Sequence, residues 1–309
     1  MGKIAFIFPG QGAQYIGMGK DIVLKCDKSN AVFDDASEAL GFDIKKMIFD
    51  GDEETLKITE NTQPAILTTS IACMQPLLEC GIKPAVAAGL SIGEYAAHVL
   101  ADTFSFKDAV RLVRKRGKYM QEAVPAGYGT MAAIIGLENG VVAECCIEAS
   151  KEGIAEPANY NCPGQVVIAG EVKAIKKAME LCSQKGAKRT TILQVSAPFH
   201  CSMLRSASEK LAVELEKVEV HNMSLPVVAN VNARYITDKS AVKDILIKQV
   251  SNPVLWEDSV NNMIKNGIDS FIEIGPGKVL AGFVKRINKN VRVFNVEDIE
   301  SLNETLKEV

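Results

Sequence analysis

Apolar positions along the chain follow two spacings, which predict two kinds of element. Short apolar runs bounded by Gly, Pro or polar residues predict buried strands, and these runs occupy 3–8, 84–90, 225–231, 270–274 and 291–296. Longer stretches with helical spacing predict helices over much of 17–40 and 62–80 and over 106–124, 202–217 and 239–266. Strands that alternate with helices in this way are typical of an α/β fold with a mostly parallel sheet.

The stretch 127–195 has a different pattern and reads as a unit of its own. Its predicted elements are strands at 130–136, 154–159, 165–170 and 189–195, with helices at 139–150 and 172–185. This βαββαβ order is that of the ferredoxin-like arrangement. We therefore expect a small ferredoxin-like domain over 127–195, inserted into a larger catalytic domain formed by 1–126 and 196–309.

Composition excludes several classes of protein. The net charge of −3 gives no sign of binding to nucleic acid or a membrane surface. No apolar run approaches the roughly 20 residues that span a bilayer, and the apolar N-terminal stretch is too short for a secretory signal. The eight cysteines form no C-x-x-C pair and no zinc-like cluster, so we expect free thiols in a reducing cytoplasm and no metal.

The most specific local motif is Gly89-x-Ser91-x-Gly93, at the junction of the strand 84–90 and a helix that begins near Gly93. A serine on a sharp strand-to-helix turn exposes its hydroxyl, and small neighbours let the backbone bend and a substrate approach. The motif in this context predicts that Ser91 is a nucleophile.

A serine nucleophile needs a base, and the chain has only three histidines. His98 lies two helical turns beyond Ser91 and reads as structural, and His221 reads as a surface residue. His200 follows Pro198 where the small domain returns the chain to the large one, which suits a residue that faces a site between domains. The alternative for His200 is a loop histidine with a local hydrogen bond.

Arg116 breaks the pattern of the helix 106–124. Other basic residues share one face of this helix, whereas Arg116 projects from the apolar stripe. A buried guanidinium must be paired, and its planar fork matches a carboxylate. The partner is either an internal Asp or Glu or the carboxylate of a substrate, and the pattern leaves both open.

The glycine-rich loop that contains Gly10 and Gly12 lacks the phosphate-binding pattern G-x-x-x-x-G-K-[ST]. Because it directly follows the first strand, a backbone N–H of this loop is a candidate partner for the N–H of Ile92 in an oxyanion hole.

Taken together, the motifs resemble those of the bacterial malonyl-CoA:acyl-carrier-protein transacylases of fatty-acid synthesis. The resemblance covers nearly the whole chain, in matching order and spacing. The matching segments are 8–14 (FPGQGAQ), 62–65 (TQPA), 89–95 (GLSIGEY), 116–121 (RGKYMQ), 159–165 (NYNCPGQ), 198–200 (PFH), Gln249 and 273–277 (EIGPG).

The resemblance implies an α/β-hydrolase-like large domain, malonylation of Ser91 and His200 as the general base. It further implies that the Gln249 carbonyl orients His200 and that the amides of Gln11 and Ile92 form the oxyanion hole. Arg116 would bind the malonyl carboxylate. Met120 and Phe199 would shape the acyl pocket, with Gln63 as a polar contributor.

Malonyl-CoA and holo acyl carrier protein would be substrates in a ping-pong reaction, with no cofactor and no metal. We expect a monomer. Because the carrier is expected to be acidic, a basic rim is also expected. Its candidates are Lys188, Arg189, Lys285 and Arg286.

Three other functions remain open at this point. A thioesterase or hydrolase would share the acyl-serine, and an acyltransferase that acts in trans for a polyketide synthase would differ only in its carrier. A non-enzymatic carrier-protein or CoA-binding module would have kept the fold without the chemistry, which the presence of Ser91, His200 and Arg116 disfavours.

Overall fold

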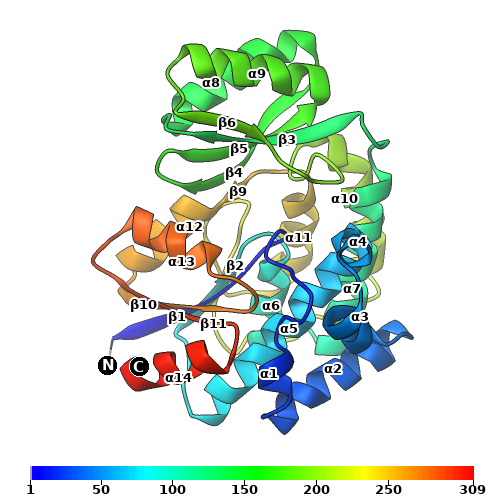
Figure 1. Cartoon of the computed structure of the whole chain (residues 1–309), viewed down its shortest axis with the longest axis vertical. Helices are drawn as coiled ribbons and strands as arrows, with labels where there is room; N and C mark the ends of the chain where they lie inside the picture. The colour runs from blue at the N-terminus through cyan, green and yellow to red at the C-terminus, as the bar shows by residue number, and fades with distance from the viewer. Residues whose placement is uncertain (1) are drawn as a thin grey trace.

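The computed structural model describes residues 2–309 as two packed units, drawn one above the other in Figure 1. The lower unit contains a six-stranded sheet in the order β11-β10-β1-β2-β7-β8, parallel except for the β7–β8 pair. This confirms the predicted α/β class and the mostly parallel sheet. The strands are β1 (Lys3–Phe8), β2 (Val86–Gly89), β7 (Val227–Val228), β8 (Tyr235–Ile236), β10 (Ile268–Ile274) and β11 (Arg292–Val296).

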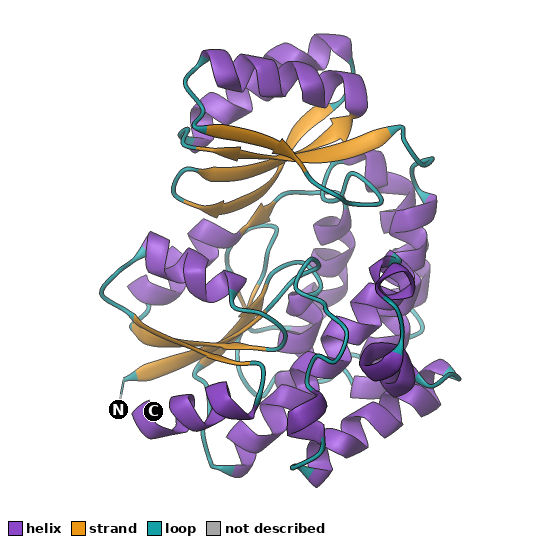
Figure 2. Ribbon diagram, in the orientation of Figure 1, coloured by secondary structure: helices purple, strands orange, loops and turns teal. Residues whose placement is uncertain are grey.

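Helices cover both faces of this sheet (Figure 2). Alternate β1 side chains point to opposite faces, so Phe6 and Phe8 pack in one apolar cluster while Ala5 and Ile7 pack in another. The first cluster takes residues from α1 (Lys20–Val23), α2 (Asp27–Leu40), α3 (Ile44–Asp50), α4 (Glu53–Lys57), α5 (Thr59–Glu79), α6 (Gly93–Leu100), α7 (Phe106–Glu122), α10 (Arg205–Leu215), α11 (Val242–Val250) and α14 (Ile299–Glu308). The second takes residues from α12 (Trp256–Lys265) and α13 (Val279–Ile287).

The upper unit has a second sheet, in the order β6-β3-β5-β4-β9. The chain runs through β3 (Gly129–Ile135), α8 (Asn139–Ala149), β4 (Ala155–Cys162), β5 (Gln165–Glu171), α9 (Val172–Gln184) and β6 (Arg189–Ile192). This is the βαββαβ order that the sequence predicts. Figure 1 shows α8 and α9 on the side of the sheet that faces away from the lower unit. A separate apolar cluster lies beneath these two helices.

Several elements differ from the sequence prediction. The second sheet gains a fifth strand, β9 (Val254–Leu255), which interrupts the helical stretch predicted over 239–266 and pairs with β4. The strand predicted over 225–231 keeps only two residues, because the chain turns back where the Ala229 amide bonds the Arg234 carbonyl. The C-terminal helix α14 was not predicted, although Asp298 and Ser301 form a capping box at its start.

The parallel pairing of β1 and β2 brings two loops together. Phe8 lies opposite Gly89 at the carboxyl ends of these strands, so residues 9–14 and 90–92 leave the sheet side by side. The Leu90 amide donates to the Phe8 carbonyl at 3.0 Å. Ligand sites in open α/β sheets form at this edge.

None of the helices within residues 2–309 has the length and apolar character needed to cross a membrane.

Candidate active site

Ser91 lies on a tight turn between β2 and α6, in the left-handed backbone region with φ 55°. A Cβ on Gly89 would lie 2.0 Å from the Gly93 carbonyl carbon, and one on Gly93 would lie 2.2 Å from the Phe8 oxygen. Only glycine fits these two positions. The Ser91 amide donates to Asn230 Oδ1 at 2.6 Å, which fastens the turn to the loop after β7.

His200 meets Ser91 from the loop before α10. Its Nε2 lies 2.6 Å from Ser91 Oγ, and its Nδ1 lies 2.9 Å from the Gln249 carbonyl oxygen. Because a carbonyl can only accept, Nδ1 carries the proton and Nε2 is free to accept the Ser91 hydroxyl proton. Burial, and secondarily the charge of Arg116, lower the His200 pKa to about 3, so the imidazole is neutral near pH 7.

Arg116 is fully buried on α7 and reaches the same point. Its Nη1 donates to Gln63 Oε1 at 2.8 Å, and its Nη2 donates to Gln249 Oε1 at 3.0 Å and to Ser91 Oγ at 3.2 Å. Within residues 2–309 no carboxylate lies within ion-pair distance of Arg116. Of the two partners left open by the sequence, the internal Asp or Glu is therefore wrong for this structure. A buried cation with neutral partners beside a serine is suited to bind an anion.

Two backbone amides, on the two loops that meet beside the Ser91 turn, donate no hydrogen bond within residues 2–309. Gly10 packs against Leu90, since a Cβ on Gly10 would lie 2.6 Å from Leu90 Cδ2, and this contact holds the two loops together. Within the described chain, neither the Gln11 amide nor the Ile92 amide donates a hydrogen bond. Free donors on two adjoining loops are what an oxyanion requires.

The three expected pocket residues are buried around Arg116 and His200. Gln63 donates from Nε2 to Met120 Sδ at 3.5 Å while its Oε1 accepts from Arg116. Phe199, which is 7% exposed, precedes His200 directly. Hydrogen bonds thus join six of the expected residues in one network, which consists of Ser91, His200, Gln249, Arg116, Gln63 and Met120.

The chain is similar to known acyl transferases. The family model described as "Acyl transferase domain" matches residues 5–305. The malonyl CoA-acyl carrier protein transacylase of Bacillus subtilis is 46% identical over 312 residues, covering 100% of this chain and 98% of the relative. That of Escherichia coli K12 is 46% identical over 288 residues, covering 93% of each chain.

The chain belongs to the malonyl CoA-acyl carrier protein transacylase family.

Solved structures of the family superpose closely. The transacylase of Clostridium perfringens has a TM-score of 0.97 and 47% identity, over 99% of this chain and 96% of that one. A malonyl-transacylase solved in complex with a holo type II polyketide synthase acyl-carrier protein has a TM-score of 0.97 and 42% identity, over 99% and 100% of the two chains.

Glu94 and Asn230 lie at the centre of the site, and the sequence analysis assigned neither of them a role. The Asn230 side chain accepts from the Ser91 amide and donates to the Gly89 carbonyl at 2.7 Å. Glu94 accepts from the Asn230 amide and from Gln249 Nε2. The sequence offered one signal for each residue. Glu94 is a lone carboxylate in the apolar helix after Ser91, and Asn230 is an amide at the carboxyl end of the strand beside β2.

The other two histidines lie outside the site. His98 is buried, with Nδ1 3.3 Å from Thr103 Oγ1, and burial lowers its pKa to about 3. His221 is exposed and lies 3.7 Å from Glu219. Neither bonds Ser91, in agreement with their structural and surface assignments. Within residues 2–309, no group of three His, Cys, Asp or Glu side chains is arranged to hold a metal ion, and all eight cysteines are free.

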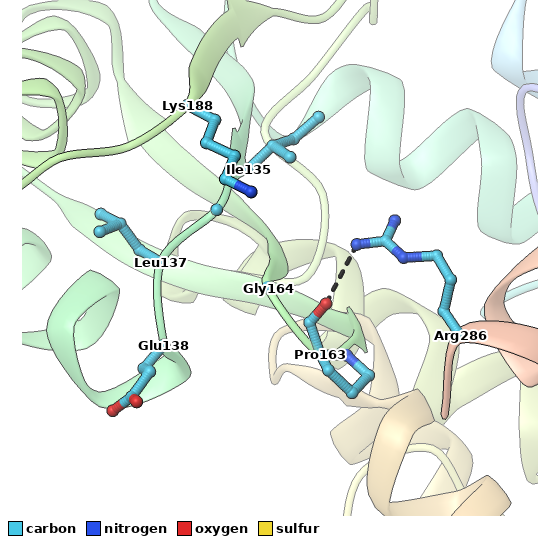
Figure 3. A pocket seen from close by; sticks show the side chains of 8 residues that line it. Ile135, Leu137, Glu138, Pro163, Gly164, Lys188 and Arg286 are labelled. Carbon is cyan, nitrogen blue, oxygen red and sulfur yellow. Dashed lines mark hydrogen bonds between the residues drawn. The ribbon is translucent and has the colours of Figure 1, made fainter. Parts of the chain in front are cut away.

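A separate cavity of about 310 Å³ lies where the two units meet at α13 (Figure 3). Lys188 and Arg286, two of the basic-rim candidates, both line it. Arg286 donates to the Pro163 carbonyl at 3.0 Å and to Gln165 Oε1 at 2.6 Å, so it joins α13 to the β4–β5 turn. Lys285 instead donates to the carbonyl of Val291, which directly precedes β11.

Proposed function

We propose that this protein transfers the malonyl group of malonyl-CoA to the phosphopantetheine thiol of acyl carrier protein, through a malonyl ester on Ser91, and so supplies fatty-acid synthesis. This proposal rests on the triangle of Ser91, His200 and Arg116, in which a buried cation with no counter-ion among residues 2–309 lies 3.2 Å from a serine hydroxyl. The comparisons support the same substrates, since the names of the relatives contain both of them.

In the first half-reaction, His200 Nε2 accepts the Ser91 proton while Oγ attacks the malonyl thioester carbon. The tetrahedral oxyanion accepts hydrogen bonds from the amides of Gln11 and Ile92. The C–S bond then breaks, and coenzyme A leaves as a thiol with the proton from His200. In the second half-reaction, the carrier's thiol gives its proton to His200 and attacks the ester, and Ser91 leaves with that proton.

Arg116 supplies the preference for malonyl in this proposal. Its fork would release Ser91 Oγ and bind the malonyl carboxylate bidentately, held in place by Gln63 and Gln249. An acetyl group would leave the buried guanidinium without an anion, so it should react poorly. Met120 and Phe199 would limit the size of the acyl group.

The finer fold assignment is part of the proposal. We assign 1–126 and 196–309 to an α/β-hydrolase-like catalytic domain and 127–195 to a ferredoxin-like domain. The βαββαβ order, the antiparallel β6-β3-β5-β4 pairing and the separate apolar cluster support the second assignment. The strand β9 shows that the catalytic domain also contributes backbone to the small domain's sheet.

The proposed acyl carrier protein would dock on the rim formed by Lys188, Arg189 and Arg286, beside the cavity in Figure 3. Lys285 is the fourth candidate; its ammonium donates to the Val291 carbonyl, as the Arg286 guanidinium donates to Pro163 and Gln165. The two transfers use only side-chain and backbone groups of this chain together with the substrates, so the proposal requires no resident cofactor or metal. Free cysteines suit the reducing cytoplasm in which we expect the protein to act, as a monomer.

The experiment that tests this function separates transfer from hydrolysis. The protein is mixed with malonyl-CoA and holo carrier protein, and malonyl-carrier and free malonate are measured over time. Malonyl-carrier should form much faster than malonate. Malonate released at the same rate with and without carrier would identify a hydrolase, and absence of both products would favour a binding module. A polyketide carrier that outcompetes the fatty-acid carrier would change the assigned pathway and leave the chemistry unchanged.

A further inference from the structure

Glu94 is a buried carboxyl group in the site for which the mechanism above has no use. Glu94 lies in the first turn of α6 with no exposed surface. Its Oε2 accepts from the Asn230 amide at 3.0 Å and from Gln249 Nε2 at 2.7 Å, whereas its Oε1 has no partner within residues 2–309. No basic side chain in that range is within ion-pair distance of it. Burying a carboxyl group without a cation costs stability that an apolar side chain would not cost. Its presence here therefore indicates a role that needs the carboxyl group.

The two donors to Glu94 hold the reacting groups. The Asn230 side chain bonds the amide of Ser91 and the carbonyl of Gly89, so it sets the left-handed turn on which the hydroxyl depends. The Gln249 carbonyl bonds His200 Nδ1. Through these two residues Glu94 is connected both to the nucleophile and to its base.

The side-chain amide of Gln249 is held in one orientation by its hydrogen-bond partners. Its Nε2 donates both protons, one to Glu94 Oε2 and one to the Ser91 carbonyl at 2.9 Å. Its Oε1 must therefore point the other way, toward Arg116 Nη2. A carboxylate only accepts, so Glu94 helps to fix which end of the amide faces Arg116. A flipped amide would present N–H groups to the guanidinium and repel it.

We propose that the Glu94 carboxylate is a positioning residue for the acyl transfer, acting through Asn230 and Gln249 to hold Ser91, His200 and Arg116 in their reactive arrangement. This inference rests on the proposed function for its substrate. Glu94 does not touch the reacting atoms itself.

Charge provides a readout that a merely structural role would not affect. Burial raises the Glu94 pKa to about 7, opposed by its two hydrogen bonds and by Arg116. The other titratable groups in the region are Arg116 from α7, His200 and Tyr95, and the pKa values of His200 and Tyr95 lie at about 3 and about 12. Glu94 is thus the group expected to titrate near neutral pH, and its protonation weakens both accepted hydrogen bonds.

Glu273 in β10 provides a matched control. It is also buried, with a pKa raised by burial to about 7, and it also accepts two N–H groups, from Leu280 and Ala281. None of its bonds involves Ser91, His200, Arg116 or Gln249. A Glu273→Gln variant therefore shows what removal of a buried charge does without the positioning contacts.

The experiment measures single-turnover formation of malonyl-Ser91 from saturating malonyl-CoA between pH 5.5 and 8.5, in wild type, Glu94→Gln, Glu94→Ala and Glu273→Gln. The wild-type rate should fall about tenfold as pH drops through about 7. Glu94→Gln keeps an accepting oxygen without the charge, so it should stay at the slow low-pH rate throughout. Glu94→Ala should be slower by about 100-fold, and Glu273→Gln should follow the wild type, with thermal unfolding confirming that each variant is folded.

At pH 8.5, rates for Glu94→Gln and Glu94→Ala within twofold of wild type would overturn the positioning role. So would a pH dependence that survives in Glu94→Gln, or a wild-type rate that does not change with pH. If the wild type forms no malonyl adduct, the proposed function fails by itself. Labelling of Ser91 by phenylmethylsulfonyl fluoride then tests Glu94 separately: about tenfold slower labelling in Glu94→Ala supports positioning, and equal labelling contradicts it.

Discussion

The active site and the second sheet are built on opposite physical principles. Around Ser91, buried polar groups hold one another, and both Ser91 and His200 have positive φ, at 55° and 60°. Within 127–195 no residue other than glycine has a positive φ, and the interior beneath α8 and α9 is apolar. Within residues 2–309, the nucleophile and its base are thus two of the four non-glycine residues with positive φ, and buried polar side chains surround them. Substitutions in the active site and in the second sheet test this difference.

The largest expected effect comes from removing the unpaired cation. Arg116→Ala should lower kcat/KM for malonyl-CoA about 100- to 1,000-fold and raise the reactivity of acetyl-CoA relative to malonyl-CoA, because the anion loses a bidentate partner. Steady-state transfer to holo carrier protein measures both.

Arg114→Ala is the control for Arg116→Ala. Arg114 lies on the same helix but is a third exposed and pairs with Glu60 at 3.3 Å. Its removal should change transfer less than twofold. Unchanged malonyl kinetics in Arg116→Ala would remove the basis for the assigned substrate.

The second-largest effect should be a loss of stability that arises within residues 127–195. Ile168 is fully buried in the apolar cluster beneath α8 and α9. Ile168→Ala should lower the free energy of unfolding by about 2–5 kcal/mol through lost burial and the resulting cavity. Denaturant unfolding measures the loss, while the rate of Ser91 acylation per folded molecule should stay near that of the wild type.

A smaller effect is expected at the boundary between the two regions. Lys188→Glu combined with Arg189→Glu should weaken carrier binding about tenfold and reduce its dependence on salt, because the proposed rim loses its positive charge. Acylation by malonyl-CoA should remain unchanged. Lys151→Glu, an exposed change outside the proposed rim, is the control. A parallel fall in acylation and transfer would show that the rim does not serve the carrier.

The smallest effect concerns the pH dependence of stability. The Glu273 pKa is about 4.5 for the free group and about 7 in the folded protein, so the folded state favours the protonated form. The contribution of Glu273 to stability is therefore lost as pH rises from about 4.5 through about 7. Glu273→Gln should flatten part of this decline in melting temperature, whereas an unchanged slope would show that the buried carboxyl does not titrate there.

Local pattern predicted much of the site. Glycines flanking Ser91 in a strand-to-helix context located the turn, and Arg116 stood out because it interrupts an apolar stripe. His200 followed from having few histidines to choose from. The roles of Ser91 and Arg116 could thus be predicted from their immediate neighbours in the sequence.

Other parts depend on contacts that no local pattern encodes. Asn230 bonds Ser91 from 139 residues away, and Gln249 bonds the Ser91 carbonyl from 158 residues away. The part played by the Gln249 carbonyl came from family resemblance, because a backbone carbonyl carries no sequence signal. The strand β9 likewise forms only because β4 is there to pair with it.

Intact mass measures acylation of Ser91 and its discharge by the carrier in one experiment. Wild type and Ser91→Ala are each incubated briefly with malonyl-CoA, and apo or holo carrier protein is then added. We expect one malonyl adduct on the wild type alone, discharged by holo carrier and not by apo carrier. An adduct on Ser91→Ala, or none on the wild type, would contradict it.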